Sequence, residues 1–133
     1  MRRLHLVAAT AVAGCILTFS LIPSDVGIGA GGFAGLTLVL HAAAYFGFAG
    51  VLSLYFHETE AGIAEAATIS FLFGLAVELA QIPVQGRFAT FPDVVANAAG
   101  ASTVMLDNRA GLVSDVIDLE RAVVDVLENL VSP

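Results

Sequence analysis

Apolar stretches separated by short polar breaks fill most of the chain. Four of these stretches contain few or no charged residues. A helix needs about 20 predominantly apolar residues to cross a bilayer, so the pattern predicts four membrane-spanning helices. They cover about residues 4–22, 36–56, 61–82 and 92–106. The fourth stretch is short, and we expect it to depend on close contacts with protein, which small residues such as Ala96 and Gly100 would allow.

Residues that end or begin helices lie between the apolar stretches. The breaks are Pro23, a glycine-rich connector at 27–35, a charged turn at 57–60, and Pro83. Thr90 is predicted to be the N-cap of the fourth helix, with Asp93 three residues later. A cleaved signal peptide is the alternative for the first stretch, since that stretch follows Arg2 and Arg3, but it exceeds the usual signal core of about 7 to 15 residues.

The pattern changes at residue 111. From there to Val131, apolar residues recur at alternating spacings of four and three, and charged residues occupy the opposite side of the predicted helix. Helices that lie on membranes are normally basic, so this acidic helix is predicted to pack on protein, such as a second copy of the chain. We expect a transmembrane domain at 1–110 and an amphipathic helix within 111–133. The apolar positions are Leu112, Val116, Leu119, Val123, Val126 and Leu130, and the charged ones are Asp115, Asp118, Arg121, Asp125 and Glu128.

The composition favours a membrane protein. Hydrophobic residues make up 58% of the 133 residues and charged residues 13%, whereas about a quarter of a soluble domain is charged. The net charge of -7 comes from 12 acidic and 5 basic residues, all of the latter arginine, which argues against a nucleic-acid partner. An acidic surface without lysine also suits a salt-rich cytoplasm, so we expect a halophilic source.

The arginine positions predict the orientation in the plasma membrane. Arg2 and Arg3 precede the first span, Arg109 and Arg121 follow the fourth, and Arg87 lies in the loop between the third and fourth. Cytoplasmic segments carry the excess of arginine, so both termini are predicted to be cytoplasmic. The expected fold is all-α, a multi-pass bundle of four transmembrane helices with a cytoplasmic C-terminal amphipathic helix.

Polar residues in three of the predicted spans fall near the non-cytoplasmic face. They form pairs spaced three or four residues apart, so that each pair shares one face of its helix. The pairs are His41 with Tyr45, Glu78 with Gln81, and Asp93 with Asn97. A charged carboxylate facing lipid costs on the order of several kcal/mol, so we expect Glu78 to face the bundle and to pair with Arg87, which could also bridge to Asp93.

Other chemistry is sparse along the chain. Within the polar cluster only His41, Glu78 and Asp93 could ligate a metal, and no HExxH or cysteine pattern accompanies them, so no metal site is predicted. No cofactor is expected, because the sequence has no nucleotide-binding loop or other cofactor fingerprint. Near the ends of their spans, His5 and His57 are expected to be solvated.

The polar residues belong to a longer series of motifs. The segments are Glu78-Leu79-Ala80-Gln81, Gly86-Arg87 and Asp93-Val94-Val95-Ala96-Asn97-Ala98-Ala99-Gly100, preceded by His41 and Tyr45. They resemble the E-x-x-Q, R, D-x-x-x-N-x-x-G and H-x-x-x-Y motifs of the VanZ-like family of membrane proteins. The resemblance covers roughly residues 20–106, although Thr37 and Leu38 stand where the family often has Asp-Lys. It implies envelope or lipid biology, because the family's namesake is linked to resistance to the glycopeptide antibiotic teicoplanin.

Three interpretations of the polar cluster stay open. The side chains could form a hydrogen-bond network that only holds the helices together. They could instead bind the anionic head group or glycan of a membrane lipid or lipid-linked envelope component, which is the function we expect, or act as a membrane enzyme on such a substrate. The expected binding residues are Arg87, Gln81, Asn97 and Tyr45, and the catalytic candidates are Glu78, Asp93 and His41.

Overall fold

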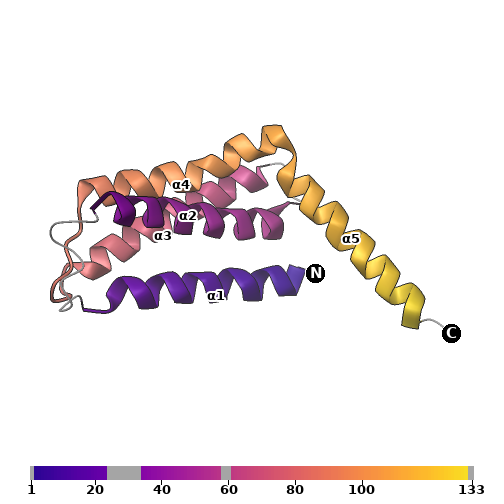
Figure 1. Ribbon diagram of the computed structural model, residues 1–133, viewed down its shortest axis with the longest axis horizontal. Helices are drawn as coiled ribbons and strands as arrows, with labels where there is room; N and C mark the ends of the chain where they lie inside the picture. The colour runs from indigo at the N-terminus through magenta and orange to yellow at the C-terminus, as the bar shows by residue number, and fades with distance from the viewer. Residues whose placement is uncertain (1, 24–33, 58–60, 132–133) are drawn as a thin grey trace.

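The computed structural model describes residues 2–23, 34–57 and 61–131, which form five α-helices (Figure 1). The helices are α1 (Arg2–Leu21), α2 (Ala34–Phe56), α3 (Gly62–Gln81), α4 (Phe91–Ala110) and α5 (Leu112–Val131). The all-α class and the positions of the predicted helices are confirmed. Most of the predicted glycine-rich connector, and residues 58–60 of the predicted charged turn, lie outside the described residues.

Within the described part of the chain, α1, α2 and α3 are long and apolar enough to cross a membrane, which indicates a membrane protein. Many of their large apolar side chains point outward, and Val7, Leu40 and Leu72 are 65%, 60% and 55% exposed. Leaving such a side chain in water costs about 1.5–3 kcal/mol relative to burial, whereas lipid would accept it. The more polar α4 does not meet the same criterion, so the fourth span is not confirmed.

The helices α2, α3 and α4 pack against one another and form the centre of the molecule. At Gly100 of α4, a Cβ atom would overlap the backbone of Ala42 in α2, so these two helices touch through their main chains. A buried cluster of Ala49, Ala67 and Val104 continues the contact among all three helices. Small side chains permit this close approach, which brings the polar residues on the three helices within hydrogen-bonding distance.

The first helix lies at the edge of this bundle, beside α2 and α3 (Figure 1). It contributes Ala9 to a buried cluster with Phe48, Leu52 and Ala66. Only 11% of its span is buried inside the protein, against 33% for α3. Packing alone therefore holds α1 less firmly than the three central helices.

Polar contacts join the N-terminal end of α1 to α5. Nε2 of His5 lies 3.0 Å from both carboxylate oxygens of Glu120, and His5 is only 5% exposed. Our expectation that His5 is solvated was therefore wrong. The reason is that the chain turns between α4 and α5 at Gly111, whose φ is 79°, and α5 then runs obliquely past the N-terminal end of α1 (Figure 1).

Replacing Gly100 with alanine tests the close approach of α2 and α4. The added methyl would force the two backbones apart, and overpacking of this kind costs about 1–3 kcal/mol. We expect Gly100→Ala to lower the melting temperature of the purified protein in detergent. The matched control is Gly47→Ala, because a Cβ at Gly47 meets no atom within 4 Å. Equal melting temperatures for the two variants would contradict the contact.

Candidate functional site

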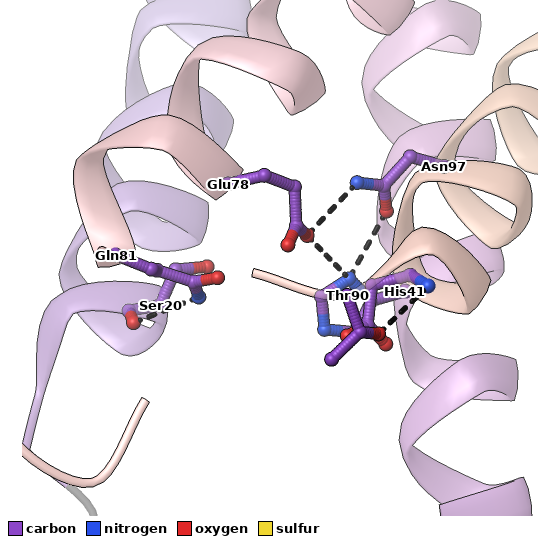
Figure 2. Close-up of polar contacts among 7 residues, drawn as sticks. Ser20, His41, Glu78, Gln81, Thr90 and Asn97 are labelled. Carbon is purple, nitrogen blue, oxygen red and sulfur yellow. Dashed lines mark hydrogen bonds and ion pairs between the residues drawn. The ribbon is translucent and has the colours of Figure 1, made fainter. Parts of the chain in front are cut away.

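The site is built around a carboxylate in the centre of the bundle. Glu78 belongs to the face of α3 that packs inward together with Gly74 and Val77, and it is 1% exposed. Its Oε1 accepts a hydrogen bond from the side-chain amide of Asn97 in α4, with an N···O distance of 3.2 Å (Figure 2). Asn97 is itself fully buried. The predicted inward orientation of Glu78 is therefore confirmed.

His41 completes a chain of hydrogen bonds across three helices. Its Nδ1 lies 3.0 Å from Oδ1 of Asn97 and 3.7 Å from Oε1 of Glu78 (Figure 2). Because the amide nitrogen of Asn97 donates to Glu78, its oxygen remains to accept a proton from Nδ1 of His41. A neutral imidazole that carries its proton on Nδ1 has its lone pair on Nε2. The Nε2 atom of His41 has no hydrogen-bond partner among the described residues.

Two further polar atoms at this site have no protein partner. They are Oη of Tyr45 and Oε2 of Glu78, both buried and both without a hydrogen bond among the described residues. The ring of Tyr45 lies against Gly74, one helical turn from Glu78, with its centroid 6.5 Å from that of His41. Buried polar groups are normally satisfied, so these atoms can bond to a polar group that enters from outside the chain.

Asp93 serves the start of α4 rather than the central chain of hydrogen bonds. Its backbone N–H donates to Oγ1 of Thr90 at 3.3 Å, and the Thr90 hydroxyl donates in turn to the Asp93 carboxylate. These bonds confirm that Thr90 is the N-cap. A carboxylate in the first turn is also favourably placed at the positive end of the helix.

Arg87 and Gln81 bind the end of α1, which the sequence did not predict. The side-chain amide of Gln81 donates to the carbonyl oxygen of Ser20 at 3.0 Å (Figure 2). The guanidinium of Arg87 donates from Nε to the carbonyl of Ile22 and from Nη2 to that of Phe19, each at 3.0 Å. We expected Arg87 to pair with Glu78 and Asp93, and this expectation was wrong.

The unmet carbonyls at the end of α1 explain why Arg87 lies there. The last carbonyls of a helix have no partner within it, and the usual cap uses the N–H groups of the residues that follow. Here Pro23 follows one residue after the α1 cap position and has no N–H to donate. The loop after α3 turns at Gly86, whose φ is 77°, and thereby brings Arg87 to these carbonyls.

The hydrogen-bond partners of Arg87 in the described part of the chain are all uncharged. Within the described ranges, Arg87 forms hydrogen bonds to carbonyl oxygens but no ion pair with a carboxylate. Carbonyl oxygens satisfy some of its N–H donors, and the Nη1 donors remain. Arg87 can therefore hold an anion through its remaining donors, because guanidinium binds carboxylate and phosphate with two parallel hydrogen bonds.

A cavity of about 370 Å³ connects Arg87 with His41. It lies between α1 and α2 and reaches Gln81 at the end of α3. Its wall is mostly apolar but includes polar side chains from α1, α2, α3 and the loop after α3. The lining includes Cys15, Phe19, Leu40, His41, Tyr45 and Arg87. Cys15 and Phe19 were not predicted at the site, since neither belongs to a polar motif of the sequence.

The structure thus brings together most of the residues predicted for the site, in two groups. His41, Tyr45, Glu78 and Asn97 meet inside the bundle, and Gln81 and Arg87 meet at the end of α1. No cluster of three potential metal ligands occurs among the described residues.

No family model, curated protein or solved structure matches this chain. The resemblance to the VanZ-like family therefore stays a hypothesis.

Removing the amide of Asn97 tests the chain of hydrogen bonds. In Asn97→Ala, Glu78 loses its donor and His41 its acceptor, and a buried unsatisfied polar group costs about 1–3 kcal/mol. We expect a loss of stability of that size or more, measured by thermal unfolding in detergent. Thr103→Ala on the same helix is the matched control, since Thr103 is exposed and bonds only to its own helix at Ala99. Similar stability of the two variants would contradict a structural role for Asn97.

Proposed function

We propose that this chain is a VanZ-like membrane protein that binds an amphipathic ligand with an anionic head group, such as a membrane lipid or a lipid-linked component of the cell envelope. The observation that carries the proposal is the charge of Arg87, which lines the cavity between α1 and α2 without a carboxylate partner among the described residues. A partly buried guanidinium that lines a mostly apolar cavity, with no carboxylate partner among the described residues, can pair with the anionic group of a ligand.

The proposed topology gives the ligand access from the outer side. In it, α4 is the fourth span and packs against α2 and α3, and both termini are cytoplasmic because four of the five arginines lie toward the ends of the chain. His41, Glu78 and Arg87 then lie toward the non-cytoplasmic face.

The shape of the cavity matches an amphipathic ligand. The apolar wall that includes Phe19 and Leu40 would contact an acyl chain, and Arg87 would hold the anionic group. The hydroxyl of Tyr45, which lines the cavity near His41 and has no partner among the described residues, would bond to a hydroxyl group of the ligand. This division of roles explains why a mostly apolar cavity also contains polar side chains.

Lipid binding by an Arg87 variant tests the proposal. The delipidated protein would be mixed with phosphatidylglycerol or phosphatidylcholine, and the bound lipid measured by native mass spectrometry. We expect the wild type to bind more of the anionic lipid than of phosphatidylcholine. In Arg87→Gln the ratio of the two bound lipids should fall about tenfold, because one charge-assisted hydrogen bond contributes about 1.5 kcal/mol. Arg3→Gln, an exposed arginine at the other end of α1, should keep the preference.

A different result would favour the structural interpretation. If Arg87→Gln keeps the same lipid preference as the wild type and only lowers the melting temperature, then Arg87 serves the end of α1 and no ligand. The proposal of a binding site would then be wrong.

An enzyme acting on the same class of ligand is the second candidate function. The observation in its favour is the chain from Glu78 through Asn97 to His41, which holds Nδ1 of the imidazole as a donor. The lone pair on Nε2 could then accept a proton from a hydroxyl group or from water in the cavity that His41 lines. A binding protein would not need an oriented lone pair at this place.

The lipids of cells that lack the chain distinguish an enzyme from a binding protein. If the chain is an enzyme, we expect the mutant cells to accumulate a precursor, visible by mass spectrometry of lipid and glycan extracts. A His41→Gln copy should fail to restore the profile, while a His5→Gln copy with matched membrane yield should restore it. An unchanged profile in the mutant cells would rule out the enzyme and leave the binding function intact.

A further inference from the structure

The helix α5 carries an apolar stripe that nothing in the described part of the chain covers. One edge of α5, with Val113, Ile117 and Glu120 half-buried, faces the bundle, and Glu120 contacts His5 there. A second, outer stripe is left exposed. It consists of Val116, Leu119, Val123, Val126 and Leu130, which are 48%, 67%, 50%, 58% and 76% exposed. An apolar stripe of this length on a helix already held by another edge indicates a partner.

The spacing of the outer stripe is that of a two-stranded coiled coil. Successive residues are separated by three, four, three and four positions, which keeps a narrow seam facing one partner helix. This order assigns Val116, Val123 and Leu130 to the a positions and Leu119 and Val126 to the d positions. Valine at a with leucine at d favours two parallel strands, and the first heptad has this combination.

The charges on α5 argue against a lipid surface as the partner. The side of the helix away from both apolar edges carries exposed Asp118 and Asp125, and its one basic residue, Arg121, already contacts Asp118 at 3.5 Å. Helices that bind the cytoplasmic leaflet carry basic residues, because that leaflet is negatively charged. An acidic helix gains no such attraction.

We propose that two copies of this chain associate through their α5 helices, which pack in parallel along the Val116 to Leu130 stripe on the side of the membrane where the N-terminus lies. Two copies inserted in the same orientation present the same end of α5 to each other, and a two-fold axis along the membrane normal relates them. The acidic sides of the two α5 helices, away from the stripe, repel each other. Salt screens this repulsion, so the association strengthens as salt is added.

Disulfide cross-linking in membranes tests this arrangement. Cys15 is the only cysteine and would first be replaced by alanine. In that background, we expect Val116→Cys and Leu130→Cys each to form a cross-linked dimer on oxidation, because parallel strands place each residue beside its own copy. Asp125→Cys, on the far side of the helix, should remain a monomer.

Other cross-linking patterns would overturn the proposal. Cross-links that form only when Val116→Cys and Leu130→Cys chains are mixed would mean antiparallel strands. Equal cross-linking at Asp125 would mean random collision. If the stripe cysteines form no cross-link and phosphatidylglycerol vesicles protect them from a water-soluble maleimide, then lipid covers the stripe instead of a second copy.

A charge in the stripe gives an independent measurement. We expect Val123→Asp to weaken the dimer at least tenfold by sedimentation equilibrium in detergent, since an unpaired charge would be buried in the seam. Arg121→Gln makes the same change in net charge on the exposed side opposite the stripe and should leave the dimer unchanged. The wild-type dimer fraction should rise with added salt. A monomeric wild type at all salt concentrations would disprove the association.

Discussion

The need to satisfy buried polar groups inside an apolar bundle organises this chain. Glu78 is almost completely buried, and its oxygen bonds to Asn97, which in turn contacts His41. Each residue comes from a different helix, so the hydrogen bonds require α2, α3 and α4 to lie at one relative height and rotation. The small residues at the crossing of α2 and α4 allow that approach, and the apolar packing around them has no comparable directional preference. The hydrogen bonds therefore fix the register and the apolar contacts supply the cohesion.

The same need explains the attachment of α1. This helix is mostly outside the core, yet both of its ends are held by polar contacts, to Gln81 and Arg87 at one end and to Glu120 at the other. A single proline after α1 removes the usual cap, and residues far along the chain supply the donors instead. Because carbonyl oxygens carry no formal charge, the partners of Arg87 among the described residues leave its positive charge uncompensated beside the cavity. The side chain that satisfies the carbonyls of α1 is thus also the one that we propose to bind an anionic group.

The sequence predicted the helices well because length and hydrophobicity decide where apolar helices form and where Pro23 or Thr90 ends or begins them. It also predicted that Glu78, Asn97 and His41 face one another, because residues three or four apart share a helix face. It failed for Arg87, since charge pairing favoured Glu78 and the competing acceptors are backbone carbonyls, which every residue carries and no motif marks. The absence of an N–H on Pro23 was the available signal.

The burial of His5 was missed because it depends on the direction of α5, which the turn at Gly111 sets. The polar composition of α4 is compatible either with a membrane span or with a helix that packs on the spans. Counting apolar residues therefore could not show whether α4 crosses the membrane.

The polar anchors of α1 all come late in the chain. The hydrogen-bond partners of Ser20 and Phe19 are Gln81 and Arg87, which lie 61 and 68 positions further along the chain. The partner of His5 is Glu120, 115 positions away. During synthesis α1 leaves the ribosome before these partners, so it first exists without them, and its exposed leucines and valines suit a lipid environment. The wall between α1 and α2 can close only after the loop that follows α3 has been translated. Truncated chains that stop before Gln81 would accordingly hold an inserted but undocked first helix, and the cavity would be the last part of the molecule to form.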